Sequence, residues 1–161
     1  MKDELRRFRC CFTGHRPGSL KRPEDDIKID LENSILRAVS DGFTTFISGL
    51  STGTEIWAAE IVIRMKSGNP NLHLIAAVPF PGVDTLWEES WQNRYRLLLS
   101  QAEYVRVMEP AYSAEAYQKR NEWMIAHSAR VIAVYNGQPS GTGRAIEYAR
   151  RCRVPVLIIP G

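Results

Sequence analysis

The chain alternates short apolar runs with longer amphipathic segments, and this alternation is its main structural signal. Short apolar runs between turn residues predict buried strands, whereas apolar positions that recur every three to four residues predict helices. The predicted strands cover residues 9–12, 44–48, 72–78, 104–108, 130–135 and 154–159. The predicted helices between them cover residues 27–40, 54–66, 85–101, 114–127 and 142–151.

Strands rich in valine and isoleucine are typical of a sheet that helices cover on both faces, which implies parallel pairing through right-handed crossovers. We therefore expect an α/β fold: a Rossmann-like three-layer sandwich with a mostly parallel sheet and helices on both faces. No linker, low-complexity segment or repeat divides the 161 residues, so we expect a single domain over residues 1–161. In open sheets of this class, ligands bind beyond the carboxyl ends of the strands.

The charge of the chain is mildly positive, with a formal net charge of +3 and acidic residues interspersed among the basic ones. A dedicated nucleic-acid binder typically has a higher isoelectric point and basic residues clustered on one face. We therefore do not expect nucleic acid as a partner. Small anionic ligands remain open.

The cysteines favour a reducing, cytoplasmic location and no metal site, because the adjacent Cys10 and Cys11 and the isolated Cys152 fit neither a zinc site nor a secreted disulfide framework. The N-terminal segment lacks the apolar region of a secretory signal. No apolar run approaches the roughly 20 residues of a transmembrane helix, so we expect no membrane span.

The loop after the first predicted strand reads FTGHRPGSLKRP. Thr13 and Gly14 can form a tight turn with free backbone N–H groups, and His15 and Arg16 add donors suited to a phosphate or carboxylate. The alternative is a solvated basic loop in which Gly14 and Pro17 are only turn residues. Because the loop leaves the carboxyl end of a strand, we favour the binding interpretation.

The second junction reads FISGLSTGTEIWAAE, where Ser48 and Gly49 end a strand and Gly53 precedes a helix. Backbone donors at such a helix start can face a bound anion or a ribose. Thr52 and Glu55 also have the spacing of a capping box, which needs no ligand to explain it. A carboxylate in the first turn repels a phosphate, so Glu55 suits a hydroxyl partner better than an anion. Both interpretations remain open.

The segment richest in glycine is YNGQPSGTGRAIEYARR, residues 135–151. Backbone N–H groups and hydroxyls at a helix N-terminus can bind a phosphate. The residues in question are Gly137, Ser140, Gly141, Thr142 and Gly143. No Lys-Ser or Lys-Thr follows the last glycine, so the segment is not a P-loop. The alternative is an ordinary turn with Thr142 as the helix N-cap.

Taken together, FTGHRP, FISGLSTGTEIWAAE and QKRNEWMIAHSARVIAVYNGQPSGTGRAIEYA resemble the SLOG superfamily of Rossmann-like proteins, and its YpsA-like branch most closely. The resemblance runs through nearly the whole chain. The superfamily also includes the Lonely Guy phosphoribohydrolases and DNA-processing protein A. The resemblance implies a nucleotide or nucleotide-derived ligand, such as ADP-ribose or a nucleoside phosphate, with no cofactor required. Superfamily relatives often dimerise, and the apolar helix faces permit a homo-oligomer without requiring one.

Residues 120–128, RNEWMIAHS, resemble the Lonely Guy segment in which an arginine precedes a methionine and a His-Ser pair. The resemblance places Arg120 at the catalytic arginine, followed by Asn121. In those enzymes the glycine loop continues as Gly-Thr, two residues and a catalytic glutamate, but that last position here holds Ala145. Glu147 lies two residues further on, about 200° around a helix. The pattern therefore favours ligand binding over catalysis.

Three functions follow from these observations. The preferred one is a nucleotide-ligand binding protein, acting as a sensor or regulatory protein. The first alternative is an N-glycoside hydrolase, in which Arg120 orients the phosphate and Glu55 or Glu147 stabilises positive charge on the ribose. The second alternative is single-stranded DNA binding, supported by the mild positive charge and the basic loop at residues 15–22. The predicted ligand-binding residues are Thr13, Gly14, His15, Arg16, Ser48, Gly49, Gly53, Glu55, Arg120, Asn121, Gly137, Ser140, Gly141, Thr142 and Gly143.

Overall fold

The computed structural model describes residues 4–161. The strands are β1 (Arg9–Gly14), β2 (Thr45–Ser48), β3 (His73–Val78), β4 (Tyr104–Val107), β5 (Arg130–Tyr135) and β6 (Val156–Pro160). The α-helices are α1 (Glu24–Ser40), α2 (Thr54–Lys66), α3 (Glu89–Gln101), α4 (Ala114–Ala126) and α5 (Gly141–Arg151), and two short 3₁₀-helices are η1 (Glu4–Phe8) and η2 (Pro17–Ser19).

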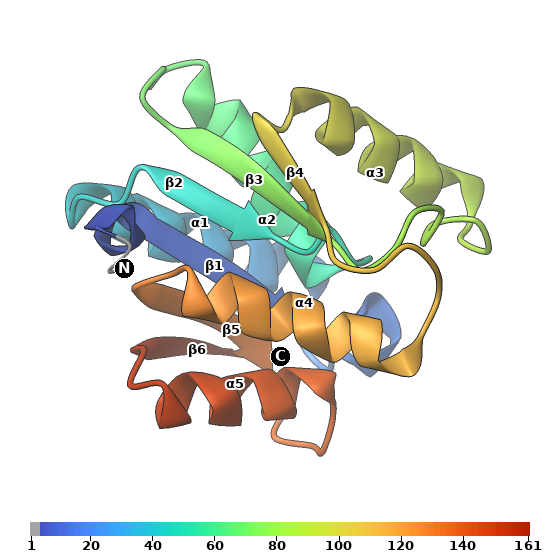
Figure 1. Ribbon diagram of the computed structural model, residues 1–161. Helices are drawn as coiled ribbons and strands as arrows, with labels where there is room; N and C mark the ends of the chain where they lie inside the picture. Colours follow the sequence, from blue (N-terminus) through green and yellow to red (C-terminus); the bar gives the residue numbers. More distant parts are fainter. Residues whose placement is uncertain (1–3) are drawn as a thin grey trace.

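The six strands form one sheet in the order β4-β3-β2-β1-β5-β6, and every described pair is parallel (Figure 1). The chain adds β2, β3 and β4 toward one edge, returns through α4 to the other side of β1, and then adds β5 and β6. The strand order therefore reverses between β1 and β5, which is where open α/β sheets bind ligands. The predicted Rossmann-like α/β fold is confirmed.

Helices cover both faces of the sheet, with α4 and α5 in front of it and α1 and α2 behind it in Figure 1. Side chains of a strand alternate between the two faces. Accordingly Cys10 and Phe12 of β1 belong to the apolar cluster that includes α1, α2 and α3, whereas Cys11 belongs to the cluster that includes α4 and α5. The sandwich thus has two apolar cores, one on each side of the sheet. No helix among the described residues is long and apolar enough to cross a bilayer.

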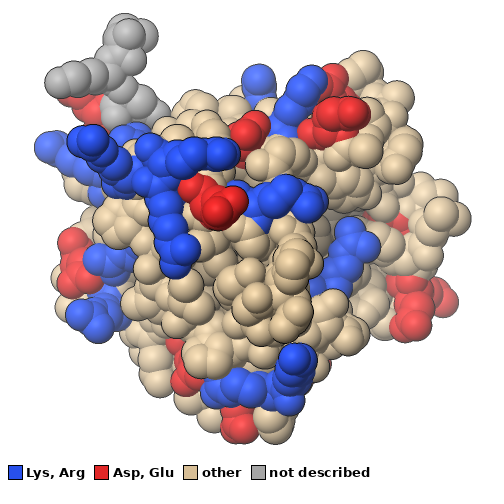
Figure 2. All heavy atoms as spheres, turned by 90° about the horizontal axis from the view of Figure 1, so that it is seen from below, with Lys and Arg blue, Asp and Glu red and all other residues tan. Residues whose placement is uncertain are grey.

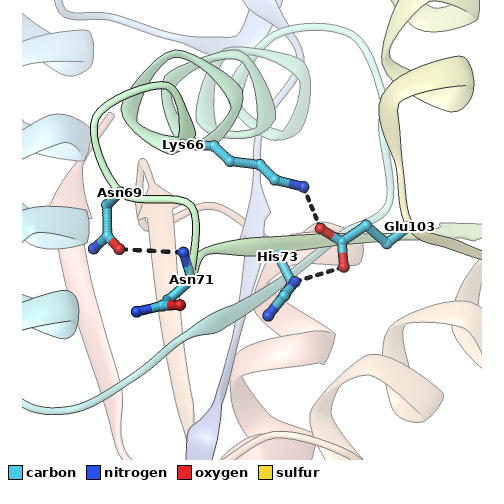
Figure 3. A network of polar contacts seen from close by, with 5 residues as sticks. All are labelled: Lys66, Asn69, Asn71, His73 and Glu103. Carbon is cyan, nitrogen blue, oxygen red and sulfur yellow. Dashed lines mark hydrogen bonds and ion pairs between the residues drawn. The ribbon is translucent and has the colours of Figure 1, made fainter.

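The edge strand β4 differs from the buried strand that its apolar residues predict, because all four of its residues are exposed. Edge strands commonly keep charged residues nearby. Here the carboxylate of Glu103, just before β4, binds Lys66 at the end of α2 and His73 at the start of β3 (Figure 3). The hydrogen bond from Lys66 lowers the pKa of the Glu103 carboxyl. This exposed network fixes the start of the strand and adds little to stability.

The predicted start of the third helix is wrong, because α3 begins at Glu89 and not at residue 85. Gly82 has a φ of 76°, and Thr85 Oγ1 donates a hydrogen bond of 2.6 Å to its carbonyl oxygen. Thr85 therefore belongs to a turn that closes back on Gly82. The first helix also begins earlier than predicted, at Glu24 directly after Pro23, with three acidic residues in its first turn. Acidic residues at this end complement the helix dipole.

Candidate functional site

A pocket of about 320 Å³ opens at the carboxyl edge of the sheet, beside the ends of β1 and β5. It brings together all three segments that the glycine pattern singles out. Its lining residues are Thr13, Gly14, His15, Arg16, Ser19, Ser51, Glu55, Tyr117, Arg120, Asn121, Ser140, Gly141 and Thr142. The walls therefore come from the end of β1, the start of α2, the middle of α4 and the start of α5.

The loop after β1 is fastened to the start of α2. The carbonyl oxygen of His15 accepts hydrogen bonds from Thr54 Oγ1 at 3.1 Å and from the Thr54 N–H at 3.4 Å. Thr54 packs so closely on β1 that a Cβ at Gly14 would lie 2.4 Å from its Cγ2 atom. Gly14 is thus required by contact with α2, whether or not a ligand is bound.

His15 lies in the pocket as a neutral imidazole. Burial lowers its pKa, and the Asn136 N–H donates a 3.0 Å hydrogen bond to Nε2, which requires that nitrogen to be unprotonated. The ring also lies against Tyr135, with a centroid separation of 5.5 Å. The remaining proton therefore sits on Nδ1, so His15 can offer a ligand a neutral donor but no positive charge.

Arg120 of α4 is buried, at 4% exposure, and its guanidinium is held by neutral groups. Nη1 donates to the carbonyl oxygen of Gly49 at 3.0 Å, Nη2 to Ser51 Oγ at 3.4 Å and Nε to Asn121 Oδ1 at 3.2 Å. Within residues 4–161 no carboxylate forms an ion pair with it. The nearest acidic group is the carboxyl of Glu55, whose pKa burial raises and the charge of Arg120 lowers. A guanidinium that lines the pocket can also bind the anionic group of a ligand.

Glu55, in the first turn of α2, is also 4% exposed, and its Oε1 atom has no hydrogen-bond partner among residues 4–161. Burial raises the pKa of this carboxyl, whereas the charge of Arg120 and hydrogen bonding with Ser51 and with the backbone of Gly49 oppose the shift. Ser48 Oγ donates a 2.8 Å hydrogen bond to the Glu55 carbonyl oxygen, which fixes the helix start. A Cβ at Gly49 would lie 2.4 Å from Glu55 Oε1 and 2.8 Å from Arg120 Cζ. The side chains of Glu55 and Arg120 therefore both pack against the Cα of Gly49, where a larger residue would not fit unless they moved.

Helix α2 begins without a side-chain cap, so the capping-box interpretation of Thr52 is wrong. The N-cap residue is Gly53, with φ 86° and ψ −126°. This backbone conformation is essentially restricted to glycine. A Cβ here would also lie 2.8 Å from Pro17 Cδ and 2.9 Å from the carbonyl oxygen of His15. Gly53 thus lets the loop after β1 cross the start of α2.

Helix α5 begins at Gly141 with Ser140 as its N-cap, so the alternative with Thr142 in that role is wrong. Ser140 Oγ accepts a 3.1 Å hydrogen bond from the Gly143 N–H. In the described part of the chain, the N–H groups of Gly141 and Thr142 have no acceptor. Both residues line the pocket, so the positive end of the helix dipole faces it.

Several predicted residues do not line the pocket: Ser48, Gly49, Gly53, Gly137, Gly143 and Glu147. The first three contact residues that do line it: Ser48 and Gly49 contact Glu55, and Gly53 lies against His15. We call Gly49, Glu55 and Arg120, which pack together, the pocket floor. Gly137 has a φ of 85° and forms part of the turn before α5. Glu147 lies in a separate hollow of the surface with Arg144 and Arg150. A binding or catalytic role for these residues stays a prediction.

The structure adds three residues to the pocket that the sequence patterns did not single out: Ser19, Ser51 and Tyr117. Tyr117 had a detectable signal, because it precedes Arg120 by three residues and such pairs share a helix face. The guanidinium carbon of Arg120 lies 5.7 Å from the centre of the Tyr117 ring. Ser51 follows Gly49 by two residues within the second junction, and no sequence motif marks it.

The fold and the pocket define a class: a Rossmann-like α/β domain with a polar pocket, edged by glycine-rich loops, at the carboxyl side of a parallel sheet. The family model YpsA, described as the YspA SLOG family, matches residues 10–151. The chain therefore belongs to this family. A UPF0398 protein of Bacillus cereus strain B4264 is 32% identical over 142 residues, covering 83% of this chain and 77% of the relative. The SPbeta prophage-derived protein YoqJ of Bacillus subtilis strain 168 is 29% identical, covering 76% and 82%.

Two solved structures share the fold. DNA processing protein A of Helicobacter pylori has a TM-score of 0.66 at 19% identity, covering 96% of this chain and 66% of that one. DNA processing protein A of Streptococcus pneumoniae has a TM-score of 0.67 at 16% identity, covering 98% and 52%. This chain therefore spans about half to two thirds of the length of these neighbours.

The comparison with the H. pylori protein corrects one expectation. That structure is described by its single-stranded DNA binding mode, so a protein with this fold binds nucleic acid. Our expectation that nucleic acid is not a partner is therefore overturned. It relied on net charge, which averages over the whole surface, whereas phosphate contacts depend on a few donors at one place.

Proposed function

We propose that this protein binds a nucleotide or a nucleotide-derived ligand, such as ADP-ribose or a nucleoside phosphate, and acts as a sensor or regulatory protein. One observation carries the proposal. A single pocket joins the buried guanidinium of Arg120 to the N–H groups at the start of α5, and within residues 4–161 the guanidinium has no ion pair and these N–H groups have no acceptor. Each of these features favours an anion, and both face the same volume.

The phosphate is assigned to the wall between α4 and α5. Gly141 and Thr142 supply backbone donors, Arg120 supplies charge, and the exposed Arg16 stands at the rim. A phosphate offers several acceptor oxygens and can engage these donors together. The pocket volume of about 320 Å³ lies at the lower end of the range for small-molecule sites, which suits a compact ligand.

The base of a nucleotide is assigned to the α4 side, where Tyr117 provides an aromatic ring. The ring packs edge-on against Phe80, with centroids 5.7 Å apart, which holds its orientation. Stacking on an aromatic ring accepts any base. Binding at this ring therefore leaves the choice of base open and makes the phosphate and sugar the parts that the pocket distinguishes.

The residues of the pocket favour binding over catalysis. Ala145, at the position of the catalytic glutamate in the hydrolase relatives, is fully buried, and Glu147 lies outside the pocket. Glu55 is the acid that remains beside Arg120. N-glycoside hydrolysis through Glu55 would release free base from a nucleoside monophosphate, which chromatography of incubated mixtures detects. We expect the ligand to be recovered intact.

Isothermal titration with AMP, ADP and ADP-ribose tests binding, and two alanine substitutions locate it. A Cβ at Gly141 would meet only Arg144 Nη2, at 3.8 Å, so Gly141→Ala preserves the fold and places a methyl group on the pocket wall. Gly18 has nothing within 4 Å and does not line the pocket, so Gly18→Ala is the matched control.

We expect Gly141→Ala to weaken binding by about 10- to 100-fold, the loss of one or two charge-assisted hydrogen bonds. Gly18→Ala should bind as the unaltered protein does. Absence of binding by all three compounds would refute the proposed function. Equal affinity of the two variants would place the ligand elsewhere.

Single-stranded DNA binding is the second candidate function, favoured by the exposed Arg16 in the pocket lining and the exposed Lys21 further along the same loop. On the face seen from below, acidic side chains interrupt the basic ones (Figure 2), so that face offers no continuous basic track. DNA binding would therefore depend on the loop and the pocket. Titration of a labelled oligothymidylate at several salt concentrations tests this, because each neutralised phosphate steepens the salt dependence. Competition by AMP would place both ligands in one site.

A further inference from the structure

The Oε1 atom of Glu55 marks an incomplete hydrogen-bond network at the pocket floor. In the described part of the chain, only this atom and Trp57 Nε1 are buried side-chain polar atoms without a partner. Buried polar groups are almost always hydrogen-bonded, and leaving one unpaired destabilises the protein. Glu55 lines the pocket, whereas Trp57 does not. Of these two residues, only Glu55 therefore presents its side chain to a ligand in the pocket.

Arg120 lies beside Glu55 without pairing with it. Both side chains approach the Cα of Gly49, yet the guanidinium donates to the Gly49 carbonyl oxygen, to Ser51 and to Asn121. A guanidinium and a carboxyl group thus lie next to each other, and both residues line the pocket. A ligand that satisfies both must present an anionic acceptor and a hydrogen-bond donor side by side.

The donor that fits Glu55 is a hydroxyl group. A phosphate oxygen would be repelled by the ionised carboxylate, and a cation would be repelled by Arg120. A hydroxyl is neutral, and it can donate to an ionised carboxylate or accept from a protonated one. This dual capacity suits a carboxyl group in a buried setting.

We propose that Glu55 determines which phosphates the pocket accepts, by hydrogen bonding to a hydroxyl group that the ligand carries near its phosphate. The pocket then takes sugar phosphates and nucleotides with intact sugar hydroxyls, and it discriminates against the same phosphates without them. This inference rests on the nucleotide-binding function proposed above. It assigns the charge of the ligand to Arg120 and α5, and its sugar to Glu55.

A pair of probes that differ only in the sugar hydroxyls tests the inference: AMP and 2′,3′-dideoxyadenosine monophosphate, titrated by calorimetry. We expect the unaltered protein to prefer AMP by about 10- to 100-fold, the value of one or two hydrogen bonds to a charged group. In Glu55→Met, which keeps a similar volume but has no acceptor oxygen, the preference should disappear while the dideoxy compound still binds. Glu55→Gln keeps an amide oxygen and should restore part of the preference.

Glu60 provides the matched control. It lies on α2 with Glu55, pairs with Arg94, and does not line the pocket. Glu60→Gln should keep the full preference for AMP. Thermal melts of each variant establish that it is folded. The comparison of AMP with the dideoxy compound on the unaltered protein requires no variant and so does not depend on the folding of one.

Equal binding of the two probes by the unaltered protein would overturn the inference and leave nucleotide binding intact. A preference for AMP that persists in folded Glu55→Met would also overturn it, because another residue would then contact the hydroxyls. If neither probe nor any other phosphate compound binds, the proposed function itself fails and the inference falls with it.

Discussion

Replacing Gly49 with alanine separates the geometry of the pocket floor from the stability of the fold. The added Cβ would lie 2.4 Å from Glu55 Oε1 and 2.8 Å from Arg120 Cζ and Nη1. Carbon atoms in contact ordinarily lie about 3.5–4 Å apart. Both side chains must therefore move by about 1 Å to accommodate the methyl group. These are the two groups that we assign to the sugar and the phosphate.

The two effects of Gly49→Ala have different sizes. The atoms in its way lie at the ends of long side chains and not in the backbone, so the cost to folding lies at the low end of overpacking, about 1 kcal/mol. That cost lowers Tm by about 2–4 °C in a domain of this size. Displacing the Arg120 guanidinium disrupts a charge-assisted contact with the ligand, which weakens binding by about 10- to 100-fold. Function should therefore suffer much more than stability.

Gly14→Ala provides the opposite case, because its Cβ would lie 2.6 Å from the Cβ of Thr54, an atom close to the backbone. We expect about 3 kcal/mol of destabilisation there. Thermal melts and titration with AMP of Gly49→Ala, Gly14→Ala and the control Gly18→Ala measure both quantities. Binding by Gly49→Ala at the unaltered affinity would refute a role for the pocket floor. A loss of stability in Gly49→Ala as large as in Gly14→Ala would show that the side chains of Glu55 and Arg120 cannot move to accommodate the methyl group.

Three further substitutions test other parts of the structure. Ser140→Ala removes the N-cap acceptor of the Gly143 N–H and should lower the free energy of unfolding by about 1 kcal/mol in urea denaturation; an unchanged midpoint would contradict the cap. Burial raises the pKa of Glu55 above its ordinary value of 4.5. The protonated carboxyl therefore contributes fully to the free energy of unfolding below that pH, and this contribution is lost as the pH rises and the buried carboxyl ionises. The difference in Tm between Glu55→Gln and the unaltered protein should therefore shift in favour of the variant from about pH 4 to about pH 8. Calorimetry that finds the same difference at every pH would show that ionisation of Glu55 does not affect stability. Gly53→Ala forces a side chain into φ 86° and ψ −126° and should destabilise the fold by about 2 kcal/mol in thermal melts, whereas a neutral effect would contradict this backbone conformation.

The fold was predictable because its strands and helices have clear periods. The predicted limits of β5 match the structure, and β1 extends only two residues beyond its prediction, to Gly14. Burial was less predictable, because it depends on which strand lies at an edge. The apolar residues of β4 resemble those of a central strand, yet β4 ends the sheet and is exposed. Sequence period does not report strand order.

The position of the pocket was predictable from the sequence, whereas the side-chain contacts within it were less predictable. Strand-end loops converge at one edge in any parallel sheet, so the pocket could be placed from the three junctions. The relation between Glu55 and Arg120 could not, because the two residues belong to different helices on opposite faces of the sheet. The N-cap of α5 was missed for a local reason: Ser140 and Thr142 both suit that position, and only the backbone decides between them.

The glycines of the site fall into two groups with different physical roles. A side chain at Gly14, Gly49 or Gly53 would strike atoms of the protein itself, so these glycines allow β1, α2 and α4 to approach one another. Gly141 lines the pocket and has open space beside it, with Arg144 Nη2 the nearest atom at 3.8 Å from an added Cβ. Most of the glycine pattern therefore reflects packing beneath the pocket. We expect phosphate affinity to depend on the start of α5 and on Arg120. Replacement of Gly14, Gly49 or Gly53 in a family member should therefore affect the packing of the fold more directly than the preference for anions.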